Sequence, residues 1–190
     1  MNRTAALLAS LALAGCAGIE PAVPPTAFRI TSPQFADNAM LAPQNAGSFA
    51  QNPNCTGKNV SPPLQWVNAP ANTKSFVLIW DDQAGRAGLG VSHAVVYGIP
   101  AGVSSFAEGE LAAAPAAGRF VAGKNTLGMH WLGPCPPKGN APQHYVLSFI
   151  ASSLEPGALA PGLTRAEVLK ALEGGKALRA ASLVLRFAQQ

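Results

Sequence analysis

Apolar runs separated by long, polar, turn-rich stretches dominate the pattern along this chain. The run SFVLIW at 75–80 is almost continuously apolar and rich in aromatic and β-branched residues, which is typical of a strand covered on both faces. Other segments that read as strands lie at 27–31, 64–67, 93–99, 145–151 and 181–187. Strands joined by turn-rich loops predict an all-β dominated fold, either a sandwich or a large mixed β domain.

The sequence predicts one clear helix, which begins after Thr164. Thr164 and Glu167 form a capping box, in which the threonine hydroxyl accepts from a free amide and the glutamate reaches back. An apolar stripe and a glycine stop follow at Leu163, Val168, Leu169, Leu172, Gly174 and Gly175. A weaker helix is expected over 110–117, although Pro115 interrupts it.

Composition fits a globular protein with many turns, since the 190 residues are 48% hydrophobic and include 19 glycines and 17 prolines. Residues 32–63 carry no strong element. So long a loop is uncommon unless it is functional or packs against a sheet. The formal charge is +4, but residues of one sign never occur three in a row. Nucleic-acid binding needs clustered Lys and Arg on one face, so we expect no nucleic-acid partner.

The N-terminus has the pattern of an export signal. One early positive charge precedes an apolar run that is too short to span a bilayer and that ends in small residues. Leu13-Ala14-Gly15-Cys16 resembles the bacterial lipobox, which predicts a signal peptide at 1–15 and lipidation of Cys16. The alternative is an ordinary signal peptide with Cys16 incidental.

The lipobox interpretation divides the chain into three parts. Residues 16–26, with three prolines, would follow the signal peptide as a tether, and residues 27–190 would form a single domain. The expected location is the bacterial cell envelope, with the protein held on the membrane through its N-terminal lipid and facing the periplasm.

If Cys16 carries lipid, Cys55 and Cys135 remain as an even pair in an oxidising compartment. Both cysteines lie in loops rich in Gly, Pro and Asn rather than in apolar runs. This favours a disulfide over two buried free thiols, although both interpretations stay open from the residues alone.

Asp81, Asp82 and His93 are the first candidates for a site. The two acids end the 75–80 strand beside a glycine-rich turn, and His93 enters a strand of apolar residues. Asp is also common in solvated turns, and a core histidine can be satisfied by backbone alone. The sequence holds no HxH, HExxH or CxxC spacing, no G-x-S-x-G and no phosphate loop. We therefore expect no metal site and no cofactor.

An ordered set of motifs resembles the phosphatidylethanolamine-binding protein family, in its bacterial Raf-kinase-inhibitor-like branch. The motifs, in order, are FRITSPQFAD at 28–37, CTGKNVSPPLQW at 55–66, TKSF at 73–76, GKNTLG at 123–128 and GPCPPKG at 133–139. Asp81, Ala84 and His93 fall in the expected order between them. Each motif alone is weak, but the ordered set covers nearly all of residues 27–188.

The resemblance implies a β-sandwich with a few short peripheral helices and a small pocket for phosphate-like anions, such as a phosphoethanolamine head group. Carried over by position, the pocket would include Asp81, His93, Tyr145 and the rigid loop of Pro136 and Pro137. The family's D-P-D-A-P motif is altered here, because residues 81–85 read DDQAG.

A second departure concerns the residues before Tyr145. Ungapped counting places Gln143 where the family has a second histidine, and His144 falls between them. Strand alternation sends Gln143 and Tyr145 to one face and His144 to the other. A one-residue bulge would restore His144 to the pocket.

These residues favour a binding protein over an enzyme. Asp81 beside His93 should stabilise the charged imidazolium, which suits capture of a small phosphate-bearing or other anionic ligand. Nothing in the sequence indicates a nucleophile activated by a base. The alternatives are an envelope interaction module that inhibits a protease or another enzyme, and a hydrolase of small esters or phosphoesters.

Overall fold

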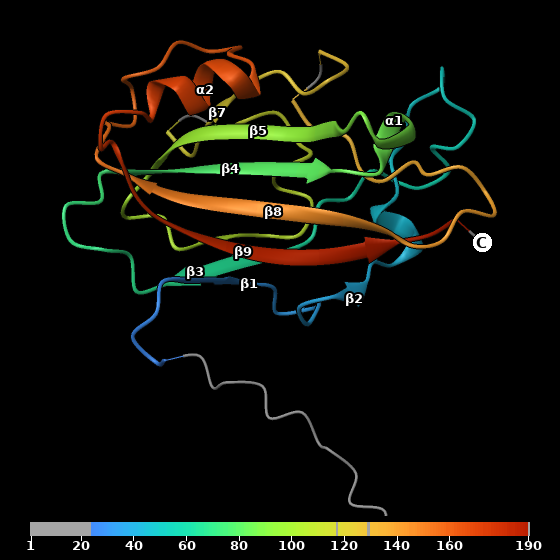
Figure 1. Cartoon of the computed structure of the whole chain (residues 1–190), viewed down its shortest axis with the longest axis horizontal. Coiled ribbons are helices and arrows are strands. Elements are labelled where there is room, and N and C mark those ends of the chain that lie inside the picture. Colours follow the sequence, from blue (N-terminus) through green and yellow to red (C-terminus); the bar gives the residue numbers. More distant parts are fainter. Residues whose placement is uncertain (1–23, 117, 129, 190) are drawn as a thin grey trace, which may run out of the picture.

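Two β-sheets build the protein, as the computed structural model shows for residues 24–116, 118–128 and 130–189 (Figure 1). The expected signal peptide at 1–15, Cys16 and most of the expected tether lie outside these described residues. In the described part of the chain, no helix is long and apolar enough to cross a membrane.

The larger sheet has six strands. In spatial order they are β2 (Ala39–Met40), β9 (Ala177–Phe187), β8 (Gln143–Ser152), β4 (Ser75–Asp82), β5 (Val91–Pro100) and β7 (Val121–Ala122). The smaller sheet consists of β1 (Arg29–Thr31), β3 (Leu64–Val67) and β6 (Ser105–Phe106). All pairs are antiparallel except β2 with β9. The β-dominated fold class and all six sequence-predicted strands are confirmed.

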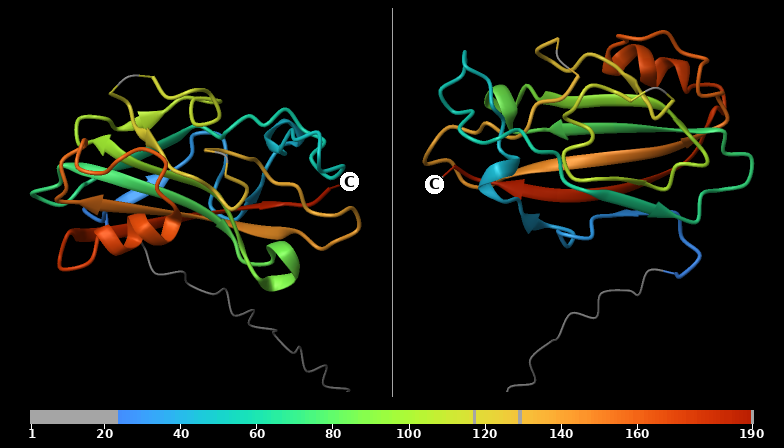
Figure 2. Two further views of the ribbon diagram at one scale, coloured as in Figure 1. Left: turned by 90° about the horizontal axis from the view of Figure 1, so that it is seen from above. Right: turned by 180° about the vertical axis from the view of Figure 1, so that it is seen from behind.

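The central strand β4 is buried at every position, as its apolar sequence predicts. Phe76, Leu78 and Trp80 face the smaller sheet and form the main core with it. Val77 and Ile79 point to the opposite face, where they pack with the helix α2 (Arg165–Ala171). We call these two faces of the large sheet the inner face and the outer face. The small sheet and α2 lie on opposite sides of the large sheet (Figure 2).

The predicted helix after Thr164 is present as α2, and its capping box is formed. Thr164 Oγ1 accepts from the Glu167 amide, and a Glu167 carboxylate oxygen accepts from the Thr164 amide at 2.8 Å. The weaker helix expected over 110–117 is wrong, because residues 110–116 form only turns, a bend and irregular chain. Pro115 removes a backbone donor from that short segment.

Two further short turns lie outside the predicted elements. The 3-10 turn η1 (Pro43–Asn45) belongs to the long loop at 32–63. The element α1 (Gly85–Gly88) is a left-handed turn, in which Arg86 and Ala87 have φ of 53° and 57°. Non-glycine residues rarely adopt this conformation, and the strain is tolerated most often near functional sites.

The long loop at 32–63 packs against a second loop at 133–139. The Gly47 amide donates to the Pro134 carbonyl at 2.8 Å, and the Gly133 amide donates to Asn59 Oδ1 at 2.7 Å. A side chain on Gly133 would collide with the carbonyl oxygen of Asn45. The two loops are therefore in close backbone contact at the end of the sandwich where β4 ends and β5 begins.

Candidate ligand-binding site

A β-bulge in β5 turns His93 toward the inner face of the large sheet. Trp80 of β4 pairs with Ala94. The next residue of β4, Asp81, already pairs with Ser92, which leaves His93 as an extra residue. His93 and Ala94 consequently both lie on the inner face, and the His93 ring packs 5.9 Å from the Trp80 ring. Bulges re-aim side chains in this way beside functional sites.

His93 lines a small cavity of about 260 Å³, which we call the inner cavity. Three adjacent strands each bring a polar group to it: Asp82 from β4, His93 from β5, and Gln143 and Tyr145 from β8. Pro136 and Pro137 also line it, together with Cys135 and Arg86. Side chains far apart in the sequence thus converge at one end of the sandwich.

Gln143 and Tyr145 share the inner face of β8, and the Tyr145 hydroxyl donates to Gln143 Oε1 at 3.1 Å. His144 is exposed on the other side of the strand, opposite Arg186 of β9. The strand has no bulge at this point, so His144 does not turn toward the cavity.

The carboxylate of the inner cavity belongs to Asp82, whereas the sequence suggests Asp81, which lies on the other face of the sheet. Residues 76, 78, 80 and 82 of β4 face inward, so alternation sends Asp81 outward. There Asp81 accepts a hydrogen bond from Arg165 Nε of α2 at 2.8 Å, within an ion pair. Asp82 instead pairs across the sheet with Tyr145 and lines the inner cavity with it.

His93 is held in one orientation and is only 5% exposed. Its Nδ1 lies 2.8 Å from the Leu132 carbonyl oxygen. Because a carbonyl can only accept, Nδ1 is the donor in this hydrogen bond, and in the neutral ring Nε2 is an acceptor. Burial lowers the pKa of His93 below its ordinary value of 6.5, outweighing the Leu132 carbonyl and the nearby Asp82. In the protein without ligand, burial therefore works against the charged imidazolium that the sequence suggests.

The Tyr145 hydroxyl is a hydrogen-bond donor at any physiological pH. Burial raises the pKa of Tyr145 far above its ordinary value, and the adjacent Asp82 carboxylate adds to this shift. The ring packs edge-on against His93, at 5.2 Å, and against Trp80, at 5.9 Å. Tyr145 thus supplies a neutral donor in an aromatic setting.

A disulfide joins the two loops that meet at the inner cavity. Cys55 and Cys135 are bonded across 80 residues of sequence, with their Cα atoms 4.7 Å apart. Cys135 is followed directly by Pro136 and Pro137, whose φ angles are restricted by their rings. The disulfide and the two prolines therefore both restrict the backbone in this wall of the cavity.

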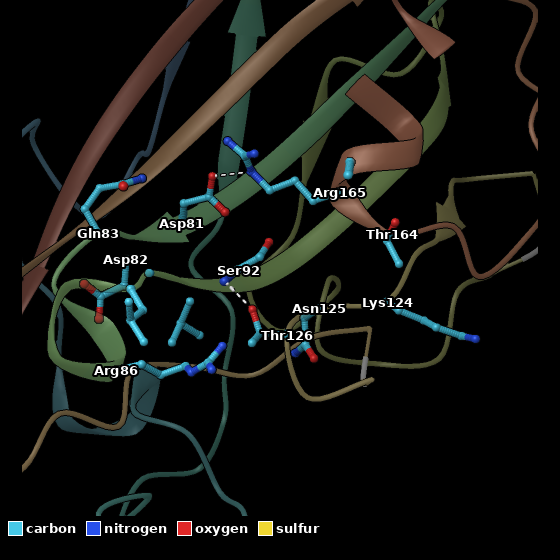
Figure 3. A pocket seen from close by; sticks show the side chains of 14 residues that line it. Asp81, Asp82, Gln83, Arg86, Ser92, Lys124, Asn125, Thr126, Thr164 and Arg165 are labelled. Atoms are coloured by element: carbon cyan, nitrogen blue, oxygen red, sulfur yellow. Dashed lines mark hydrogen bonds and ion pairs between the residues drawn. The ribbon is translucent and has the colours of Figure 1, made fainter. Parts of the chain in front are cut away.

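A larger cavity, of about 520 Å³, lies on the outer face of the same sheet end (Figure 3). We call it the outer cavity. It is lined by Asp81, Ser92, Thr126 and Arg165, among others. Asp82, Arg86 and Val91 line both cavities, so the turn that follows β4 lies between them.

Sequence reasoning missed Arg86 and Arg165. The sequence shows a glycine-rich turn at 84–88 beside the two aspartates, but no pattern in it marks the arginine. Arg165 reads only as the first residue of a capped helix. Among the described residues, no group of three or more His, Cys, Asp or Glu side chains could hold a metal ion.

Fold and site together define a β-sandwich protein with two polar cavities at one end of its large sheet. A family model described as phosphatidylethanolamine-binding protein matches residues 31–188, and the chain belongs to this family.

Individual relatives agree. A UPF0098 protein of Aquifex aeolicus is 36% identical over 121 residues, which cover 63% of this chain and 70% of that protein. The crystal structure of Escherichia coli YbcL, described as a new member of the mammalian PEBP family, aligns with a TM-score of 0.74 at 25% identity. The alignment covers 86% of this chain and 99% of YbcL. The CT736 homologue of Chlamydia trachomatis aligns with a TM-score of 0.72 at 27% identity, covering 87% and 99%.

Proposed function

We propose that this protein binds a small phosphate-bearing ligand in the inner cavity and does not turn it over. The observation that carries the proposal is the convergence of His93, Gln143 and Tyr145 on one cavity, beside a single carboxylate, Asp82. A bulge is needed to bring His93 there, and the opposing wall is cross-linked by the Cys55–Cys135 disulfide.

The cavity offers donors that suit a phosphate oxygen. Gln143 uses its carbonyl oxygen to accept from Tyr145, so its amide nitrogen keeps two protons to donate. His93 is neutral without ligand, and a bound anion would favour the protonated ring. Ligand binding should therefore take up a proton at His93, which converts Nε2 from an acceptor into a charged donor.

Asp82 determines which phosphate compounds fit best. A carboxylate beside the site repels a bare dianion, but it attracts a cationic group a short distance from the phosphate. A zwitterion such as phosphoethanolamine satisfies both ends, with its phosphate toward His93 and its ammonium toward Asp82. We therefore expect phosphoethanolamine to bind more tightly than inorganic phosphate.

Binding without turnover is supported by the lining of the inner cavity. None of the described residues in this lining is a serine, a threonine or a free thiol, because Cys135 is in a disulfide. The Tyr145 hydroxyl keeps its proton at neutral pH and is a poor nucleophile. His93 therefore has no hydroxyl nucleophile of the usual kind to activate.

Calorimetry on the purified protein tests this function, with phosphoethanolamine, inorganic phosphate and ethanolamine as probes. The wild type should bind phosphoethanolamine, and His93→Gln should weaken binding by about ten- to a hundredfold, since a charge-assisted hydrogen bond contributes roughly 1.5–3 kcal/mol. His144→Gln is the matched control and should bind as the wild type does. Equal binding by the two histidine variants, or none by the wild type, would contradict the proposal.

We further propose that the protein is exported and held on the envelope membrane by a lipid on Cys16. The lipobox-like residues 13–16 support this proposal, and they lie outside the described part of the structure. Mass spectrometry of the N-terminal peptide should show an acylated Cys16. Cys16→Ala should move the protein from the membrane fraction to the soluble fraction. An unmodified Cys16 inside an intact N-terminus would refute the anchor.

A further inference from the structure

The outer cavity is a second candidate site that the proposed function does not use. Three segments far apart in the sequence line it: the turn at 83–90 with Arg86, the loop at 124–126, and the start of α2 with Arg165. At about 520 Å³ it falls in the ordinary range for small-molecule pockets, roughly 300–1,000 Å³. Its floor is the outer face of β4 and β5, where Asp81 and Ser92 are cross-strand neighbours.

Two guanidinium groups border this cavity from opposite sides. In Figure 3, Arg165 with Asp81 borders one side and Arg86 the other, with Ser92 between them. Arg165 uses Nε toward Asp81, at 2.8 Å, and its side chain is 47% exposed, so its two amino groups stay available. Arg86 forms no ion pair with any described residue.

The guanidinium groups of the lining, rather than its net charge, suit an anionic ligand. Three basic side chains and two acidic ones line the cavity, and one of the acids, Asp81, is already paired with Arg165. The Lys124 side chain points away from the centre of the cavity in Figure 3, which leaves Arg86 and Arg165 as the cations that face it. Each guanidinium group can recognise phosphate or carboxylate oxygens in a bidentate manner.

Two buried polar atoms on the floor lack a hydrogen-bond partner among the described residues. They are Asp81 Oδ1 and Ser92 Oγ, and Asp81 as a whole is only 8% exposed. A buried, unsatisfied polar atom costs about 1–3 kcal/mol, so each one calls for an explanation. A ligand hydroxyl can donate to the carboxylate oxygen and can also bond the serine hydroxyl.

We propose that the outer cavity binds a phosphorylated polyol, of which a sugar phosphate is the simplest kind. The phosphate lies between Arg86 and Arg165, and ligand hydroxyls reach Asp81 Oδ1 and Ser92 Oγ. Asp81 then serves two purposes, because one of its oxygens holds Arg165 in place and the other accepts from the ligand. This site is separate from the phosphate-binding function proposed for the inner cavity and does not depend on it.

Calorimetry with glucose 6-phosphate, glucose and inorganic phosphate tests the proposal on the purified full chain. Glucose 6-phosphate should bind at least tenfold more tightly than either of the other two probes. Arg165→Gln should weaken its binding by tenfold or more, and Ser92→Ala by about threefold. Arg179→Gln, which changes an exposed arginine of β9, is the matched control and should have no effect.

His93→Gln separates the two cavities, because it should leave glucose 6-phosphate binding unchanged. If Arg165→Gln fails to fold with Asp81 unpaired, the double variant Asp81→Asn with Arg165→Gln removes both charges of the pair and should show the same loss. Absence of binding by the wild type would overturn the proposal. So would equal affinity for inorganic phosphate, or a loss with His93→Gln that matches the loss with Arg165→Gln.

Discussion

His93 and Tyr145 lie edge to face, with their ring centroids 5.2 Å apart, although their strands β5 and β8 are separated by β4. The contact exists because the bulge in β5 turns His93 toward the inner face, where its ring packs against Trp80 of the intervening strand β4. A buried, neutral histidine beside a tyrosine that keeps its proton makes the inner cavity sensitive to pH.

The stability of the ligand-free protein should fall as the pH drops below about 6.5. The folded-state pKa of His93 is lowered, so the unfolded chain binds more protons between that pKa and the ordinary 6.5. Stability is therefore lost through this window and restored above it. Urea unfolding at a series of pH values between about 5 and 8 measures how the free energy of unfolding changes with pH through this window. His93→Gln should flatten it, whereas the exposed His144→Gln should not.

Ligand affinity should show the opposite dependence on pH. If binding protonates His93, the affinity for phosphoethanolamine rises as the pH falls from about 8 toward 6.5, before the phosphate itself takes up a proton near pH 6. Calorimetry in two buffers of different ionisation enthalpy should reveal the proton taken up. A pH-independent affinity in the wild type would show that binding takes up no proton, and proton uptake that persists in His93→Gln would assign the proton to another group.

Removal of the disulfide should destabilise the protein. The bond closes a loop with a sequence separation of 80, for which the chain-entropy model gives about 4.5 kcal/mol. The double variant Cys55→Ser with Cys135→Ser should lose stability of this order in chemical denaturation. A reducing agent should destabilise the wild type similarly and leave the double variant unchanged. Equal stability of wild type and double variant would show that the loops at 32–63 and 133–139 are held by packing alone.

Thr164→Ala should destabilise the protein by about 1 kcal/mol, the usual loss for an N-cap hydroxyl. The hydroxyl accepts from the Glu167 amide at the start of α2, whose Val168 is buried in the outer core. Thr164→Ser keeps the hydroxyl and is the matched control, so it should retain most of the stability. Thermal unfolding compares the two variants, and identical losses would point to the lost methyl group rather than the cap.

The sequence predicted the strands and the face of Gln143, because both follow from simple periodicity. The apolar run at 75–80 is buried on both sides, and the alternation of β8 separates Gln143 and Tyr145 from His144. Local patterns of this kind survive folding because the sheet ladder preserves the two-residue period.

Periodicity misleads at the bulge, and motif position misleads at the pair of aspartates. Counting along β5 from Val95 places His93 on the outer face, and only the ladder with β4 shows the extra residue. The choice of Asp81 came from motif position, whereas the inward period of β4 selects Asp82. Arg86 could not be recognised, because its position between the two cavities depends on a left-handed turn, and the residue types in that turn do not predict this conformation.

Because Cys55 and Cys135 are bonded to each other, the constraint on the wall of the inner cavity depends on the redox state of its surroundings. Thiols stay reduced in the cytoplasm and oxidise in the envelope. If the protein is exported as proposed, a newly made chain would carry a cavity wall that is not yet locked. Ligand competence would then mature only after export, so that the protein acquires its full affinity in the compartment where its ligand is to be met.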